Sequence, residues 1–393
     1  MQFNRDLGEF FDAAEMLPVA SAHFAPDTRM AGAAGRKLLQ NLVDDAARVR
    51  VPSWLDPCLV DFDRSEEFIA CRGLSEEFVA ADRGTMGLCR ELGFLPTYSC
   101  INYQTVSPPR FGENLAWGDT GTVIAANSLF GARSNFEGGP SALASALLGC
   151  TPAYGLHLDR NRRANMQVEI QCDPREIADW GALAACSGEF AVGYETIPVF
   201  HGDYEPPDFD MLKQFGVALA SYGGHAMFHL AGVTPEAPTL EAACGDMTVT
   251  ERRVVTAADL ESVYEKNSFS GNDVDLVVFA APQLSMDEVA QVVHGLEDRP
   301  VHENTRLIMA VDPQVRAQAD NAGLAGRALA LGAEFTTGTC FYGEAPLMQA
   351  ATGWNNLVTN SAKLVNTLAS TGYNVALRRV RQCLQAAQTG RLP

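Results

Sequence analysis

The sequence predicts an α/β protein built on parallel sheets, and two observations carry this prediction. Helix and strand patterns alternate along much of the chain. Near the C-terminal end, strand-like runs at 274–280, 306–311 and 335–337 are separated by stretches with helical periodicity. Strands joined through helices run parallel, so we expect a sheet with helices on both faces. The length of 393 residues favours two or three domains.

The first half of the chain holds three expected elements. Residues 36–47 have helical spacing, and the run 49–51 before Pro52 is typical of a short strand. The apolar run 123–126 indicates either a buried strand or a short buried helix, with Asn127 and Ser128 at its end. After the turn expected at Gly138–Pro140, Ser141 is expected to cap a helix over 142–148 that ends near Gly149.

In the second half, Ser285 and Glu288 form the pattern of a capping box that opens a helix to about residue 296, and residues 314–331 are helical by pattern. Residues 200–210, rich in Pro, Asp and Tyr, suggest a surface loop or a boundary between approximate lobes 1–200 and 210–393. The second lobe would end in a β-α-β-α-β domain from about 272. Strand ends bring Ala281, Cys340 and residues 360–361 to expected pocket positions.

Composition excludes several classes of function. The net charge of −19 disfavours nucleic acid and anionic lipid surfaces as partners. No apolar run approaches the roughly 20 residues that a membrane-spanning helix needs. Charges at Arg5 and Asp6 interrupt the start too early for a signal peptide, and ten cysteines without CxxC pairs suggest reduced thiols. We therefore expect a soluble, cytoplasmic protein.

One long motif connects the chain to a known family. Residues 117–162 read WGDTGTVIAANSLFGARSNFEGGPSALASALLGCTPAYGLHLDRNR. This stretch closely resembles the hallmark of aconitase X proteins, and the resemblance continues through RVRVPSWLDP at 48–57, Ser99–Cys100, GVTPEA at 232–237 and Thr339–Cys340 to Thr359–Lys363. It covers nearly the whole chain.

The resemblance implies an activity and a partner. Members of the family are hydro-lyases with an aconitase-like catalytic region of three α/β domains, which here would span residues 1–393 without the small swivelling domain. In two-subunit members that domain is a separate small subunit, and the pair acts as phosphomevalonate dehydratase. In fused members the substrate is cis-3-hydroxy-L-proline. Residues 135–141 resemble the two-subunit form, which implies a heterodimer that acts on a small hydroxy acid.

The resemblance also implies an iron–sulfur cluster held by three cysteines, two of which match Cys100 and Cys340. The third is replaced by Ala281, in a segment that reads Ala-Ala-Pro-Gln where relatives have Gly-Cys-Pro-His. A methyl group does not ligate iron, so three alternatives stay open: a two-cysteine site completed by other donors, a mononuclear metal, or no metal. The plain alternative for both cysteines is two small buried residues.

Catalytic and substrate-binding residues follow from the same resemblance. Ser128, Lys363 and His23 are the acid–base candidates, and Lys363, one of only four lysines, would bind a carboxylate or serve as a base if burial lowered its pKa. The candidates for contact with substrate are Asp56, Pro57, Asn127, Arg133, Ser361 and Arg29. Asp56 stands where relatives more often have Asn, and its charge would repel a phosphate or carboxylate.

Each of these residues has a structural alternative. Asn127 and Ser128 would also suit a turn, and Arg133 would also suit a pair with Glu137. A different class of function stays open as well, because loss of one cluster cysteine is compatible with a silent relative that acts as a binding or assembly subunit. His157 with Asp159 is interpreted as scaffold.

Overall fold

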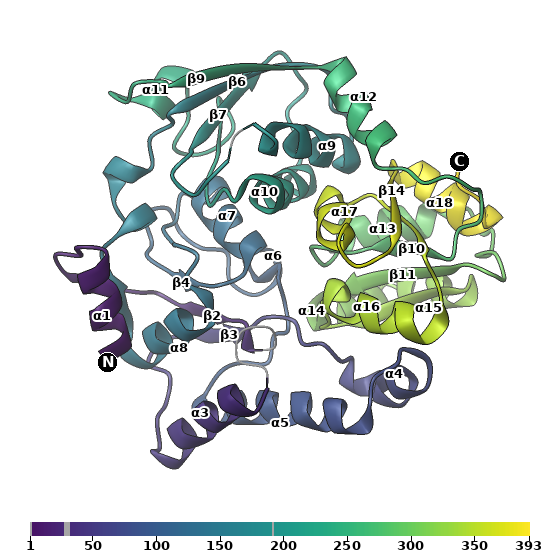
Figure 1. The fold of residues 1–393 in the computed structure, drawn as a ribbon, viewed down its shortest axis with the longest axis horizontal. Helices are drawn as coiled ribbons and strands as arrows, with labels where there is room; N and C mark the ends of the chain where they lie inside the picture. Colours follow the sequence, from purple (N-terminus) through teal and green to yellow (C-terminus); the bar gives the residue numbers. More distant parts are fainter. Residues whose placement is uncertain (1, 27–31, 191) are drawn as a thin grey trace.

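The computed structural model describes residues 2–26, 32–190 and 192–393, which form three α/β units around helices α7 (Thr120–Leu129) and α10 (Phe209–Gly223) (Figure 1). Each unit has its own all-parallel sheet, with strand orders β3-β2-β4, β8-β7-β6-β9 and β12-β11-β10-β13-β14. The predicted α/β class with parallel sheets is therefore confirmed. None of the described helices has the length and apolar character that a membrane crossing requires.

The first unit contains short buried strands. Its parallel sheet consists of β2 (Ala22–Phe24), β3 (Ser53–Leu55) and β4 (Ala116–Trp117), and an antiparallel pair is formed by β1 (Met16–Pro18) and β5 (Cys150–Pro152). The helices are α1 (Gln2–Phe10), α3 (Gly32–Asp44), α4 (Ser65–Cys71), α5 (Glu76–Leu92), α6 (Asn102–Thr105), α7 and α8 (Gly138–Leu148), with short 3₁₀ turns at Phe62–Arg64, Gly155–His157 and Asp159–Asn161. Strands this short leave little periodic signal in a sequence.

The second unit has a sheet of four strands, β6 (Met166–Gln171), β7 (Pro198–Gly202), β8 (His229–Leu230) and β9 (Glu251–Thr256). Its helices are α9 (Ile177–Gly188), α10, α11 (Leu240–Cys244) and α12 (Ala257–Lys266). Residues 203–208, near the boundary expected at 200–210, connect β7 to α10 inside this unit.

The third unit is the most regular. Its strands are β10 (Leu276–Phe279), β11 (Arg306–Val311), β12 (Ala333–Thr337), β13 (Asn356–Thr359) and β14 (Asn374–Leu377); its helices are α13 (Met286–Gly295), α14 (Pro313–Asn321), α15 (Leu324–Ala330), α16 (Phe341–Thr352), α17 (Ala362–Leu368) and α18 (Val380–Thr389). Alternate strand residues enter different cores. Val277 and Leu307 pack in the cluster that includes α13, α14 and α18, while Leu276 and Ile308 pack in the cluster that includes α16 and α17. Helices on both faces are thus confirmed.

Three local expectations are wrong. The expected strand 49–51 is replaced by β3 after Pro52, whose carbonyl accepts the Ala22 N–H at 3.0 Å. Helix α8 begins at Gly138 and not after Ser141, because a proline is accepted in the first turn of a helix. The helix expected over 314–331 is two helices, since Gly323 takes a left-handed conformation between them.

Two other expectations are settled by the same structure. The run 123–126 belongs to a buried helix, α7, which is one of the two alternatives the sequence left open. The capping box of Ser285 and Glu288 is confirmed at the start of α13.

Candidate active site

Cys100 and Cys340 are brought together by hydrogen bonds between the loop before α6 in the first unit and segments that follow strands β10 and β12 in the third unit. The Cys100 N–H donates to Gln283 Oε1 at 3.0 Å, and the Gln283 N–H donates to Cys100 Sγ at 3.3 Å. Gln283 Nε2 donates to the carbonyl of Thr339, next to Cys340, at 3.5 Å. Both cysteines are half-buried, so solvent reaches part of each. We call Asp56, Cys100, Asp119, Cys340 and Lys363 the junction.

The segment of Cys340 is fixed against the first unit. The Cys340 N–H donates to the carbonyl of Cys58 at 2.9 Å, and Cys58 Sγ donates to the carbonyl of Gly338 at 3.0 Å. Gly338 has φ +68°, and a Cβ there would lie 2.9 Å from the Cβ of Tyr98. This position therefore requires glycine, and the close approach of two chain segments sets where Cys340 lies.

Lys363 is the cation of the junction. It lies in the first turn of α17, directly after strand β13. Burial opposes its charge, but the interactions with Asp119, with the Cys100 and Cys340 thiols when these are ionised, and with Asp56 outweigh burial and raise the pKa of Lys363. Its ammonium therefore stays protonated. The condition for a base, a pKa lowered by burial, is not met, and the geometry favours binding of an anion.

The acidic side of the junction comes from the first unit. Asp119 caps α7, where its Oδ2 accepts the N–H of Gly121 at 2.8 Å and that of Thr122 at 3.1 Å. Asp56 follows β3, and its Oδ1 lies 3.4 Å from His23 Nε2. Burial, followed by the charges of Asp119 and Asp56, raises the pKa of the Cys100 thiol. That thiol is therefore neutral near pH 7 in the protein alone.

His23 is fully buried in β2 and held through both ring nitrogens. Nε2 lies 2.9 Å from the carbonyl of Ser99 as well as near Asp56, and Nδ1 lies 3.5 Å from Thr122 Oγ1. Pro57, which follows Asp56, is also buried.

Asn127 and Ser128 lie inside α7 and not at an exposed strand end. Asn127 Nδ2 donates to the carbonyls of Ser134 at 2.8 Å and Ala226 at 2.9 Å, and Asn127 Oδ1 accepts from Arg162 at 3.1 Å. Ser128 Oγ accepts the N–H of Phe228 at 2.9 Å. Both side chains are sealed from solvent, and the geometry favours a structural role for both.

The other expected substrate contacts are engaged elsewhere or lie outside the described residues. Arg133 pairs with Asp159 and donates to the carbonyl of His157, so the alternative pair with Glu137 is wrong. Ser361 Oγ caps α17 by accepting the N–H of Leu364 at 3.2 Å, and it donates to the carbonyl of Ala281 at 2.7 Å. The hydroxyl is therefore occupied within the protein. Arg29 belongs to residues 27–31, outside the described ranges.

The residues present do not fit a cluster held by three cysteines. Ala281, at the third position, offers only a methyl group, while its neighbours Gln283 and Ser361 contact Cys100 and α17. Within the described ranges, no three or more His, Cys, Asp or Glu side chains are grouped so that they could hold a metal ion. The thiols and carboxylates of the junction lie near one another but do not form such a group of ligands.

Sequence reasoning missed Asp119 and Gln283. Asp119 carried a usable signal, because an aspartate one turn before an apolar helical run is a frequent N-cap. Gln283 was noticed only as part of the segment that departs from the family motif, and its role was not predicted, since its partners Tyr98, Cys100, Val311 and Thr339 are distant in the sequence. Such residues are found only when the chain segments are placed in space.

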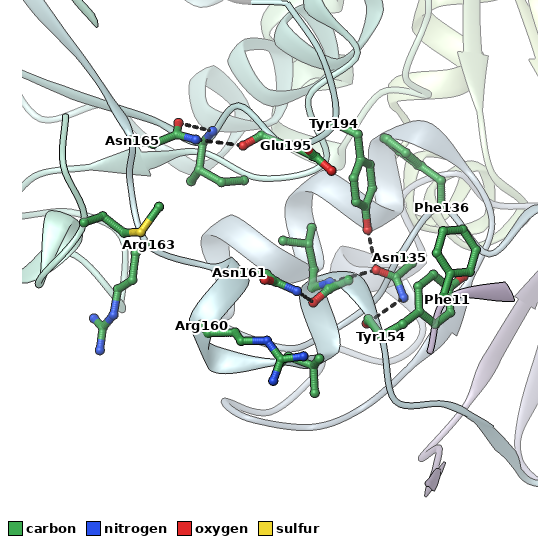
Figure 2. A pocket seen from close by; sticks show the side chains of 15 residues that line it. Phe11, Asn135, Phe136, Tyr154, Arg160, Asn161, Arg163, Asn165, Tyr194 and Glu195 are labelled. Atoms are coloured by element: carbon green, nitrogen blue, oxygen red, sulfur yellow. Dashed lines mark hydrogen bonds between the residues drawn. The ribbon is translucent and has the colours of Figure 1, made fainter. Parts of the chain in front are cut away.

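A cavity of about 690 Å³ lies apart from the junction (Figure 2). Aromatic and amide side chains line it, among them Phe136, Tyr154, Tyr194 and Asn135, with Arg160 on its wall. Tyr194 donates a hydrogen bond to Asn135, whose Nδ2 donates to the carbonyl of Tyr154 at 3.2 Å. None of the described site candidates lines this cavity, so it belongs to a different part of the first and second units.

The three parallel-sheet units and the meeting of strand ends between the first and third define an aconitase-like α/β body. Family models confirm this class in detail: "Aconitase X first domain" matches residues 1–160, "Aconitase X second domain" 164–265 and "Aconitase X third domain" 274–389. The chain belongs to the aconitase X family, as its motifs predict.

Relatives of known name cover almost the entire chain. The phosphomevalonate dehydratase large subunit of Thermococcus kodakarensis is 30% identical over 97% of this chain and 92% of that protein. The cis-3-hydroxy-L-proline dehydratase of Pseudomonas aeruginosa is 33% identical over 92% of this chain, which spans 62% of that longer protein. The crystal structure of Thermococcus kodakaraensis aconitase X in its holo-form superposes with a TM-score of 0.87 at 29% identity, covering 98% of this chain and 94% of the other.

Proposed function

We propose that this chain is the large subunit of a dehydratase that removes water from a small hydroxy-carboxylate, with phosphomevalonate as the first candidate substrate. Similarity over the full length of phosphomevalonate dehydratase large subunits supports the reaction class and the subunit type. The observation that carries the proposal is the junction, where a protonated lysine and two carboxylates from three separate segments meet beside half-buried thiols.

The chemistry assigned to the junction follows from its charges. Elimination of water needs a fixed substrate carboxylate, a base for the neighbouring carbon-bound proton and assistance for the departing hydroxyl. Lys363 supplies the cation for the carboxylate, and Asp56 with His23 behind it supplies the proton acceptor. Because the residues do not fit a three-cysteine cluster, we assign no step to such a group.

Asp56 favours a second candidate, a dehydratase of a cyclic hydroxy amino acid such as cis-3-hydroxy-L-proline. A carboxylate at this position repels a phosphate, whereas it attracts the positively charged ring nitrogen of a hydroxyproline. The similarity to the cis-3-hydroxy-L-proline dehydratases of Pseudomonas aeruginosa and Hypocrea jecorina supports the same reading.

The proposed partner is a small swivel-domain subunit. The large-subunit names of the relatives imply a second chain, and the half-buried thiols and lysine are open to contact from a partner that would close over the junction. We propose, on the basis of the composition, that the enzyme is located in the cytoplasm.

The test is an assay of the purified chain together with a small swivel-domain subunit encoded by the same organism. Phosphomevalonate and cis-3-hydroxy-L-proline are offered separately, and loss of water is followed by mass spectrometry. Turnover of either supports the reaction class, and the ratio of the two kcat/KM values names the substrate. A stable two-subunit complex that turns over neither substrate would overturn the proposal in favour of a silent binding subunit. D56N is expected to slow turnover of both substrates, because it removes the proposed proton acceptor, and to slow that of cis-3-hydroxy-L-proline more, because the charge that attracts the ring nitrogen is also lost.

A further inference from the structure

Gln283 occupies a position where all three units of the molecule meet. Its side chain is 2% exposed. The amide contacts the first unit at Tyr98 and Cys100, and the third unit at Val311 and Thr339. Its backbone carbonyl accepts from Nζ of Lys213, a fully buried lysine of the second unit, at 3.4 Å. No sequence motif assigns a role to this glutamine.

The contacts of the amide are directional and nearly exhaust its capacity. Oε1 accepts the Cys100 N–H at 3.0 Å, and Nε2 donates toward the carbonyls of Tyr98 at 3.1 Å, Val311 at 3.3 Å and Thr339 at 3.5 Å. Because an amide has two acceptor lone pairs and two donors, this pattern fixes both its orientation and the three backbone segments around it. Two of these segments carry Cys100 and Cys340, and the third is the end of β11 at Val311.

Lys213, which donates to the backbone carbonyl of Gln283, is itself held in place. Lys213 forms ion pairs with Glu288 and, at 3.0 Å, with Asp210, and Glu288 completes the capping box of α13. A buried lysine paired in this way keeps its charge and holds the backbone of residue 283 in place. The amide therefore projects from a rigid support.

Two residues earlier, Ala281 stands where relatives of the family have a ligating cysteine. A cluster bound by three thiolates would cross-link the segments of Cys100, residue 281 and Cys340 through metal–sulfur bonds. In this chain the same segments are cross-linked by hydrogen bonds: Gln283 joins Cys100 to Thr339, and Ser361 Oγ donates to the carbonyl of Ala281 at 2.7 Å. We infer that Gln283 is a positioning residue that holds Cys100 beside Cys340. Its hydrogen bonds take the place of the link that a third cysteine ligand at position 281 would provide in a cluster.

The first test measures how fast the Cys100 thiol reacts. Iodoacetamide alkylation of the full chain is followed by peptide mass spectrometry in wild type, in Q283M, which preserves side-chain volume, and in Q388M as matched control. Gln388 donates one hydrogen bond to the carbonyl of Leu296 at 2.8 Å, remote from the junction. Cys100 is expected to react about fivefold faster in Q283M, the factor that corresponds to one lost hydrogen bond. Equal rates in Q283M and Q388M would overturn the inference.

A measurement on wild type alone covers the case in which Q283M does not fold. Hydrogen exchange of the chelator-treated protein is followed in peptides that contain Cys100 and Cys340. Protection that is unchanged by the chelator is expected, because hydrogen bonds and not a metal hold these segments. Loss of protection in both peptides on chelation would contradict the inference.

The second test measures metal binding. Wild type and A281C/Q283H, which restores the residue types of the family motif, are incubated anaerobically with ferrous iron and sulfide, and both elements are then counted per chain. Wild type is expected to hold background amounts and the double variant to gain both. Stoichiometric iron and sulfide in wild type, or no gain in the double variant, would overturn the assignment of residue 281 as the position of the missing third ligand. These readouts do not depend on turnover, so their failure leaves the proposed reaction open.

Discussion

The junction and the centre of α7 both consist of residues that match family motifs, but they differ in solvent exposure and in how their charges interact. At the junction, Lys363 and two half-buried thiols lie among charges that act on one another. Around α7, Asn127 and Arg162 are sealed from solvent, and Arg162 donates to Asn127 Oδ1 at 3.1 Å, to the carbonyl of Leu156 at 2.9 Å and to Glu236. Motif similarity identifies both regions. Partial exposure and interacting charges are what distinguish the candidate catalytic residues of the junction from the structural residues around α7.

The largest effect is expected from removal of the buried arginine. R162A leaves the Glu236 carboxylate and several buried oxygens without their donor, and loss of one partner of a buried ion pair costs about 3–5 kcal/mol. The free energy of unfolding from urea titration should fall by this amount. R175A, which removes an exposed pair with Asp173, is the control and should change it by less than about 0.5 kcal/mol. A small loss in R162A would show that α7 is not held as a scaffold.

Lys363 should give the opposite signature, a loss of activity with little loss of stability. K363M removes the cation proposed for the substrate carboxylate, and removal of one preorganised electrostatic contact costs about 10²–10³-fold in rate. The measurement is kcat/KM in the two-subunit assay, accompanied by a urea titration of the same protein. K266M changes an exposed lysine and serves as control. An active K363M enzyme would remove Lys363 from the proposed chemistry.

How far the sequence could predict these regions depends on the range of the interactions. The third unit was predictable because β11 and the capping box of α13 are local patterns. Strands of two or three residues in the first unit, such as β2, are fixed by pairing with distant strands and have no local signal. Family resemblance predicted Cys100, Cys340 and Lys363, and the expectation that the ends of parallel strands lie near a pocket supported Cys340. Gln283 was not predicted, because its contacts exist only after the units have docked.

Asp82, a buried carboxylate that forms no ion pair with a residue in the described ranges, contrasts with the paired Glu236. Burial raises the pKa of Asp82 in α5 to about 6, against weaker opposing hydrogen bonds from Leu59 and Val60. Because the folded-state pKa lies above the unfolded value of 3.8, the stability that Asp82 contributes is present at low pH and is lost as pH rises through about 6.

D82N should therefore gain stability relative to wild type by about 1 kcal/mol between about pH 5.5 and about pH 7.5. The measurement is a pair of urea titrations at the two pH values, with D287N, an exposed carboxylate in the first turn of α13, as control. A difference between wild type and D82N that does not change with pH would mean that the Asp82 carboxyl does not titrate within this range.

A similarly small effect is expected at Ser361, which lies next to the junction but whose hydroxyl is hydrogen-bonded within the fold. S361A removes the N-cap of α17 and the hydrogen bond to the carbonyl of Ala281, and loss of an N-cap typically costs about 1 kcal/mol. Urea titration measures this loss, and S285A, which removes the N-cap of α13, gives the scale for a cap in the same unit. If S361A instead raised KM about tenfold while stability stayed unchanged, the hydroxyl would have to contact substrate. Ser361 would then belong to the substrate-binding residues together with Lys363, although its hydrogen bonds indicate a structural role.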